Sequence, residues 1–269
     1  MSVLYLFTAL FPEARGINRA FQLKKDPESR AFQRFVGDQI TLTVTGVGCA
    51  AACTAAAETL QHARPGDLLV NAGLAAGRAE PGTIFLINRL TDETSGRTFY
   101  PDMVWTSPFP EIALHTGNRI ADTPPADGLY DMEGAALFQA AGYYLGPDRM
   151  LFLKVVSDAG MDRAVTAQKA EEWMSQPALL AFLRKLADRP EEAEVPLNAA
   201  QEDAVERLIK GLHSSATMAA EVRQWMTWLA LEGEPIEKTI TEWFAEGILP
   251  CASRQEGKIC LGKLRDTVV

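Results

Sequence analysis

Three acidic residues stand where a carboxyl group can do chemistry. Glu13 follows the apolar run Val3–Ala9, and Asp158 follows the apolar run Arg149–Ser157. Glu133 lies at the start of a helix that the sequence predicts over Asp131–Leu145. Carboxyl groups held in different protonation states can serve as general acid and general base. An ionised carboxylate can also accept both hydroxyl protons of a vicinal diol, such as that of a ribose.

Each acid also has a purely structural interpretation. Glu13 can be a solvated loop acid, Asp158 can cap the next helix, and Glu133 can be stabilised by the dipole at a helix N-terminus. The functional interpretation therefore depends on whether the three side chains converge.

Strand-like and helix-like segments alternate over the first 190 residues. The predicted strands are Val3–Ala9, Ile40–Thr45, Asp67–Ala72, Thr83–Leu90 and Arg149–Ser157, and helices are predicted over Pro12–Phe21, from the Gly46-Val47-Gly48 turn to about His62, over Asp131–Leu145 and over Val165–Ala187. This order predicts an α/β three-layer fold with a mixed, largely parallel central sheet flanked by helices. Ligands bind such sheets at the carboxyl ends of the strands, which is where Glu13 and Asp158 are expected.

The turn Gly46-Val47-Gly48 after the second predicted strand has two interpretations. With Ala51 it fits a G-x-G-x-x-A pattern, which is typical of dinucleotide-binding loops. Asp67, the acid at the matching distance, opens the next strand instead of ending it, so it cannot reach a ribose beside the glycines. A tight turn that lets a helix approach the sheet is the simpler interpretation.

Composition excludes several classes of protein. The 269 residues carry a net charge of −9, which argues against a general nucleic-acid binder. The cysteines form no CxxC pair and the histidines are scattered, so we expect reduced thiols and no metal or other cofactor. The uncharged run Ile40–Ala57 is interpreted as strand, turn and buried helix, not as a membrane span. No secretion signal is evident before Val3–Phe11, and we expect a cytoplasmic protein.

Residues 191–269 are predicted to form a second domain, joined by the linker Asp188–Pro196 to the first domain at residues 1–190. Three helices are expected, over Asn198–Leu212, Ser215–Leu231 and Pro235–Ala245, followed by a hairpin around Glu256-Gly257. This order suggests a small winged-helix-like module. Its 14 acidic and 8 basic residues favour a docking or oligomerisation element over a DNA reader.

Several motifs in order resemble the nucleoside phosphorylase/nucleosidase superfamily, in the branch of methylthioadenosine/S-adenosylhomocysteine nucleosidase and futalosine hydrolase. The motifs are Thr45-Gly46-Val47-Gly48, Asn71-Ala72-Gly73-Leu74-Ala75-Ala76-Gly77, Asp131-Met132-Glu133-Gly134-Ala135-Ala136 and Val156-Ser157-Asp158. The resemblance covers residues 1–187 and leaves out the C-terminal module.

The resemblance implies a role for each site residue in cleaving the N-glycosidic bond of a purine nucleoside or a 5′-modified nucleoside. Asp158 would be the general acid that protonates the leaving purine, and Glu13 would polarise the attacking water. Glu133 would hold the ribose hydroxyls and Met132 would pack against the sugar. Substrate contacts are also implied for Gly73, for Lys154, which stands where the family usually has Arg, and for Ile120, in the stretch that matches the base-binding turn.

Two departures from the family pattern bear on the nucleophile and the base. Leu74 replaces the usual Ser or Thr, so a hydroxyl that could hold phosphate is missing. Gly117-Asn118-Arg119-Ile120 lacks the aromatic residue that stacks on the base in relatives. We therefore expect water as the nucleophile, with phosphorolysis or a catalytically weak nucleoside-binding protein as alternatives. Pro108-Phe109-Pro110 lies where relatives extend a loop to a neighbouring subunit, which implies a homodimer.

Overall fold

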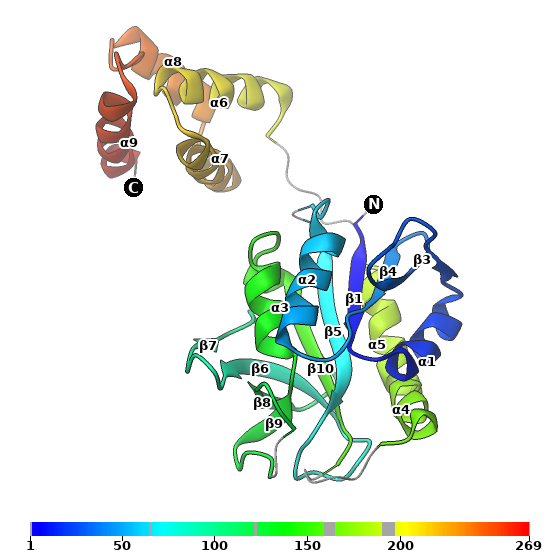
Figure 1. The fold of residues 1–269 in the computed structure, drawn as a ribbon. Coiled ribbons are helices and arrows are strands. Elements are labelled where there is room, and N and C mark those ends of the chain that lie inside the picture. Colours follow the sequence, from blue (N-terminus) through cyan, green and yellow to red (C-terminus); the bar gives the residue numbers. More distant parts are fainter. Residues whose placement is uncertain (1, 65, 121–122, 159–164, 190–196, 269) are drawn as a thin grey trace. The chain divides into compact units, whose positions relative to one another are not determined.

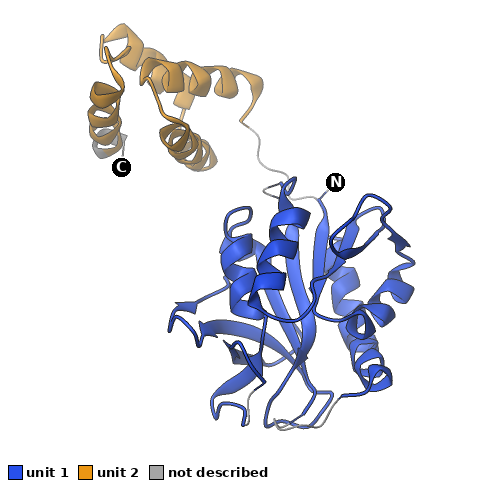
Figure 2. Cartoon of the chain, viewed as in Figure 1, with its two compact units in different colours: residues 1–192 blue, residues 193–269 orange. Residues whose placement is uncertain are grey.

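The computed structural model describes residues 2–64, 66–120, 123–158, 165–189 and 197–268, with the backbone alone at 266–268. The chain divides into two compact units, Met1–Glu192 and Ala193–Val269 (Figure 2). The predicted boundary between residues 190 and 191 lies outside the described residues.

The first unit is built on one mixed sheet (Figure 1). Its strands follow the order β2-β3-β4-β1-β5-β10-β6-β8-β9, and β7 pairs with β6. The bounds are β1 Leu4–Thr8, β2 Lys24–Lys25, β3 Gln33–Val36, β4 Ile40–Val44, β5 Leu68–Ala75, β6 Ile84–Asp92, β7 Thr98–Phe99, β8 Glu111–Thr116, β9 Gly128–Asp131 and β10 Met150–Val156. The four central strands β4, β1, β5 and β10 are parallel, so their carboxyl ends share one edge.

Helices cover both faces of this sheet. One face packs against α1 (Phe11–Phe21), α4 (Ala167–Met174) and α5 (Pro177–Ala187), and the other against α2 (Cys49–Leu60) and α3 (Gly134–Ala141). In β1, Leu4 and Leu6 enter the first core, whereas Tyr5 and Phe7 enter the second. Burial on both faces explains why the central strands are largely apolar, and this architecture confirms the predicted fold class.

The glycine turn after β4 has the backbone that glycine alone adopts readily. Gly46 and Gly48 have φ angles of 81° and 99°, and α2 begins at the next residue. The segment Ile40–Ala57 is thus a strand, a turn and a helix, as predicted. None of the helices in the described part of the chain is long and apolar enough to cross a membrane.

The sequence did not predict the outer strands. Neither β3 nor β8 and β9 has a continuous apolar run, because each lies near an edge of the sheet and buries only part of its side chains. The predicted helix Asp131–Leu145 begins later than expected, since Asp131 is the last residue of β9 and α3 starts at Gly134. The region predicted as one helix over Val165–Ala187 is two helices, α4 and α5.

The second unit consists of helices around its own core. The three predicted helices are present as α6 (Ala199–Gly211), α7 (Ala216–Leu231) and α8 (Ile236–Ala245). The predicted hairpin is wrong, because residues Arg254–Val268 form a further helix, α9. Cys260, Leu261 and Leu264 are buried at helical spacing, and the Ser253 hydroxyl accepts a hydrogen bond from the amide of Glu256 at the helix start.

Gly257, which the sequence suggests as a turn residue, serves a different purpose in α9. A Cβ atom at this position would lie 1.8 Å from the carbonyl oxygen of Leu212. The glycine therefore allows α9 to approach the backbone at the end of α6. A winged-helix module needs a strand pair where α9 stands, so the winged-helix-like prediction is wrong.

Candidate active site

Glu13 lies in the first turn of α1, just beyond the carboxyl end of β1. Its Oε2 atom accepts hydrogen bonds from the amides of Ala9 and Leu10 at 2.8 and 3.1 Å, and its Oε1 atom accepts one from Leu74 at 3.4 Å. The side chain is buried. Burial raises the pKa of Glu13 above its usual range, although the backbone donors and the Lys154 charge act in the opposite direction.

Lys154 is a buried cation in the middle of β10. Its Nζ atom lies 2.9 Å from the Oδ2 atom of Asp131, and the two side chains are 2% and 1% exposed. Burial alone would lower the pKa of Lys154, but the carboxylates of Asp131, Glu133 and Glu13 outweigh it and raise that pKa. The lysine therefore stays charged at neutral pH.

Glu133 stands between the end of β9 and the start of α3. Its Oε1 atom accepts a hydrogen bond of 2.7 Å from the amide of Gly48 in the turn after β4. Burial, together with the negative charge of Asp131, raises the pKa of Glu133 to about 7. Glu133 therefore changes its protonation state near neutral pH.

These four residues, Glu13, Asp131, Glu133 and Lys154, form what we term the Lys154 cluster. It brings α1, β9, the start of α3 and β10 together through buried ionisable groups. Because three carboxyl groups face one ammonium, the negative charges outnumber the positive one, and the Lys154 cluster favours binding an additional proton. A buried site of this kind, with strongly shifted pKa values, is a candidate for catalysis or ligand binding.

Gly73 shows how closely two members of the cluster approach β5. A Cβ atom built on Gly73 would lie 3.5 Å from the Oε2 atom of Glu13 and 3.7 Å from the Nζ atom of Lys154. Gly73 pairs with Lys154 in the sheet register. The structure thus brings Gly73, Glu13, Glu133 and Lys154 together in one buried group.

Asp158 lies at the same edge of the sheet, two residues beyond the end of β10. Its Oδ2 atom accepts a hydrogen bond of 2.5 Å from the Ser157 hydroxyl, and its carbonyl oxygen accepts one of 2.8 Å from the amide of Gly77. The side chain is half-buried. These contacts fix Asp158 beside the end of β5, and the segment that follows it, residues 159–164, lies outside the described residues.

Met132 and Ile120 differ in their surroundings. Met132 is half-buried between Asp131 and Glu133, and its carbonyl oxygen accepts a hydrogen bond from the Cys49 thiol at 3.4 Å. Ile120 follows β8 and is 74% exposed, so its side chain contributes little to the packing of this unit. Of the two, Met132 adjoins the Lys154 cluster directly.

Two polar residues, Asp131 and Thr116, have roles in the site that the sequence did not indicate. The hydroxyl of Thr116 donates to the Oδ1 atom of Asp131 at 2.6 Å and accepts a hydrogen bond from the amide of Ala135 at 2.9 Å. Thr116 belongs to β8, a strand that the sequence did not predict. The sequence shows the Asp-x-Glu spacing of Asp131 and Glu133. Because Asp131 is predicted to begin a helix, its ion pair with Lys154 on β10 could not be inferred.

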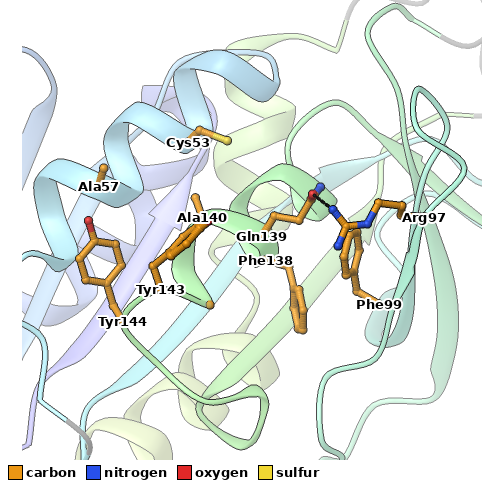
Figure 3. A pocket seen from close by; sticks show the side chains of 10 residues that line it. Cys53, Ala57, Arg97, Phe99, Phe138, Gln139, Ala140, Tyr143 and Tyr144 are labelled. Carbon is orange, nitrogen blue, oxygen red and sulfur yellow. Dashed lines mark hydrogen bonds between the residues drawn. The ribbon is translucent and has the colours of Figure 1, made fainter. Parts of the chain in front are cut away.

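A hollow of about 530 Å³ lies elsewhere on the unit, over the outer side of α2 and α3 (Figure 3). It is lined largely by aromatic and small side chains, including Phe99, Phe138, Tyr143 and Tyr144. Arg97, its one cationic lining residue, contacts Gln139 at 3.4 Å. Among the described residues that line this hollow there is no carboxylate.

The described residues offer little for a metal. Within them, no group of three or more His, Cys, Asp or Glu side chains is placed to hold a metal ion. The four cysteines are present as thiols. The Lys154 cluster itself offers carboxyl groups, an ammonium and backbone amides.

Comparisons of the whole structure identify the fold of the first unit. The structure matches 5′-methylthioadenosine/S-adenosylhomocysteine nucleosidase from Campylobacter jejuni with a TM-score of 0.56 and 12% identity, over 70% of this chain and 99% of that one. The fold is that of the nucleosidases.

Two further solved structures agree with this fold. 5′-Methylthioadenosine nucleosidase from Arabidopsis thaliana matches with a TM-score of 0.56 and 18% identity, over 69% of this chain and 94% of that one. Futalosine hydrolase from Helicobacter pylori matches with a TM-score of 0.54 and 14% identity, over 70% of this chain and 97% of that one. Neither a family model nor a curated protein matches the sequence. The nucleosidase fold confirms the resemblance drawn from the motifs.

Proposed function

We propose that the first unit hydrolyses the N-glycosidic bond of a purine nucleoside or a 5′-modified nucleoside. The observation that carries this proposal is the meeting of Glu13 and Glu133 around Lys154 at the carboxyl edge of the parallel strands, in a nucleosidase fold. Asp158 lies at that same edge. Cleaving such a bond passes through an oxocarbenium-like state, which needs an acid for the leaving group and a base for the nucleophile.

In the proposed reaction, the bond between C1′ and the purine nitrogen breaks and its electron pair goes to the base. Asp158 gives a proton to the purine at N7. Water forms the new bond to C1′ while Glu13 takes one of its protons, a step that its raised pKa favours. Solvent then restores the proton to Asp158 and removes it from Glu13, so the products are the free base and ribose.

The remaining site residues would bind the substrate. Ionised Glu133 accepts the hydroxyl protons of the ribose diol, and Met132 packs against the sugar. Gly73 leaves room at the end of β5, and Lys154 holds the carboxylates of the cluster in place by its charge. Ile120 would border the base, with its exposed side chain available to cover a bound ligand.

Water is the preferred nucleophile because of Leu74. Its amide donates to Glu13, while its side chain packs against the core shared with α1, α4 and α5. No hydroxyl is therefore available at this position to hold a phosphate. A phosphorolytic enzyme remains the alternative that the same fold allows.

The test is release of free base from a panel of purine nucleosides and 5′-modified nucleosides, with and without inorganic phosphate. We expect release of base and ribose without phosphate. Release that requires phosphate, with ribose 1-phosphate as product, would replace hydrolysis by phosphorolysis. A ligand-induced rise in the melting temperature without any release would instead indicate a nucleoside-binding protein.

We also propose that the protein acts in a reducing compartment such as the cytoplasm, where thiols persist.

We further propose that the protein is a homodimer. Phe109 packs edge-on against Phe182 of the same chain at 5.6 Å, so it is used in this unit's own core. The aromatic hollow of Figure 3, where Tyr143 is 88% exposed, is the better candidate surface. Tyr143→Lys should give monomers by sedimentation equilibrium. Trp228→Lys, on α7, should do so only if the second unit forms the dimer.

A further inference from the structure

Asp131 is held by three different elements at the end of β9. Its Oδ1 atom accepts a hydrogen bond from the Thr116 hydroxyl of β8 at 2.6 Å. Its Oδ2 atom accepts from the amide of Gly134, at the start of α3, at 2.9 Å and lies 2.9 Å from the Lys154 ammonium of β10. One buried carboxylate thus joins three strands and a helix.

These contacts leave Asp131 little capacity for a ligand. A carboxylate has about four acceptor positions, and three are used by protein donors. The side chain is 1% exposed, so a ligand has no access to it. Asp131 can therefore influence a reaction only through the groups that it holds.

The first group that Asp131 holds is the start of α3. Amides in the first turn of a helix have no partner within the helix. Asp131 accepts from the amide of Gly134, and Thr116 accepts from the amide of Ala135. Glu133 immediately precedes these two residues, so its backbone position is fixed by the same pair of side chains.

The second group is Lys154. The charged groups that face Glu133 are Asp131 from β9, Lys154 from β10 and Glu13 from α1, with the Cys49 thiol at the start of α2 also nearby. Without the charge of Asp131, the anionic groups of the described residues that act on the ammonium would be Glu133 and Glu13. It would then occupy the carboxylate that the proposed function assigns to the ribose.

We infer that Asp131 is a positioning residue, which neutralises Lys154 and fixes the start of α3 so that Glu133 is free to accept the hydroxyl protons of a ligand. This inference rests on the proposed function for the identity of that ligand. The coupling between Asp131 and Glu133 is independent of the proposed function, because it is a property of the unliganded protein.

The test compares Asp131→Asn with the wild type by carbon-13 NMR titration of the Glu133 carboxyl in the full chain. Asparagine keeps the shape and one of the two acceptor oxygens, but it removes the charge. We expect the wild-type titration midpoint near pH 7 to fall by about one unit, a tenfold change in the ionisation constant. The acid limb of kcat/KM for nucleoside hydrolysis should move by the same amount.

Thr116→Val is the control for charge, because it removes the hydroxyl that donates to Asp131 and accepts from the Ala135 amide, and it keeps the charge of Asp131. It should leave the Glu133 midpoint within a few tenths of a unit. An unchanged midpoint in Asp131→Asn, or an equal shift in Thr116→Val, would overturn the inference. If the wild type releases no base, the proposed function fails while the NMR titration still decides the coupling.

Asp131→Glu keeps the test decisive if Asp131→Asn does not fold. The longer side chain retains the charge but cannot keep all three contacts. We then expect a Glu133 midpoint close to that of the wild type together with a KM raised about tenfold, because the start of α3 is displaced. An unchanged KM would contradict the positioning role.

Discussion

The backbone amide of Gly48 donates a hydrogen bond of 2.7 Å to the Oε1 atom of Glu133. The two residues are 85 positions apart in the chain. The glycine turn after β4 is thus tied directly to the carboxylate at the start of α3. The turn therefore has a role in the site: it holds the Glu133 carboxylate. This role is independent of the dinucleotide-binding pattern that its sequence also fits.

Gly48→Ala should therefore affect both stability and activity. Gly48 has φ 99° and ψ 159°, a region that other residues avoid, so the substitution should cost about 1–3 kcal/mol. Because the turn would shift its amide away from Glu133, KM for the nucleoside should rise. Urea denaturation and steady-state kinetics measure the two effects.

Gly96→Ala is the control for that experiment. Gly96 also has a positive φ, 69°, and a Cβ atom there would meet only open space, but it lies in the turn between β6 and β7. It should lose stability without a change in KM. An equal change in KM for both variants would refute the link between the Gly48 turn and the site.

Asp158→Asn should lower kcat about 10²–10⁴-fold if Asp158 protonates the leaving base. The amide cannot donate the proton that the departing purine needs. Asp148→Asn is the matched control, because Asp148 precedes β10 as Asp158 follows it, at the opposite edge of the sheet. Retained turnover in Asp158→Asn, measured as base release, would remove this residue from the role of general acid.

Glu133→Gln should change how stability depends on pH. The folded-state pKa of about 7 lies above the ordinary value of 4.5, so Glu133 stabilises the fold most below pH 4.5. That contribution is lost as the pH rises through 7. Relative to Glu133→Gln, the wild type should lose on the order of 3 kcal/mol of unfolding free energy between pH 4.5 and pH 8.

Urea denaturation across this pH range measures the difference, with the exposed Glu80→Gln as a control that should follow the wild type. The same substitution at Glu133 should raise KM and lower kcat together, since the diol contact positions the sugar throughout the reaction. Parallel stability curves for wild type and Glu133→Gln would argue against the raised pKa.

Gly257→Ala should destabilise the second unit alone. Its Cβ atom would meet the carbonyl oxygen of Leu212 at 1.8 Å, and such overpacking typically costs about 1–3 kcal/mol or more. Gly262→Ala on the same helix has open space and should stabilise α9 by about 0.5–1 kcal/mol. Hydrogen exchange of the α9 amides should therefore accelerate in the first variant and slow in the second.

Much of the first unit could be predicted from sequence because its central strands are buried on both faces. That burial makes β1, β5 and β10 nearly continuous apolar runs, and glycine or proline stands near several of their ends. The strands β8 and β9, at the end of the sheet order, are short and mix polar with apolar residues, so they give no such run. A hairpin was predicted in place of α9 because Gly257 was interpreted as a turn residue. In the structure a glycine is required there because α9 lies close to the backbone at the end of α6.

The site was predictable to the extent that parallel strands end at one edge. Glu13 and Asp158 are expected at that edge on this basis, whereas the family resemblance adds Glu133. The structure joins Glu133 to Glu13 through Lys154. The role of Asp131 was not predictable, because it depends on Thr116 of the unpredicted strand β8. Such contacts across strands leave no periodic signal in the chain.

Lys154 is the one polar residue among the seven of β10, and the other six are apolar. Its ion-pair partner Asp131 comes from β9, which is separated from β10 by β6 and β8 in the order of the sheet. If the outer strands separated from the sheet, the buried ammonium of Lys154 would lose its ion-pair partner in an apolar environment. Local opening of these strands therefore costs much free energy. On heating, inactivation and collapse of the sheet should accordingly be one cooperative event.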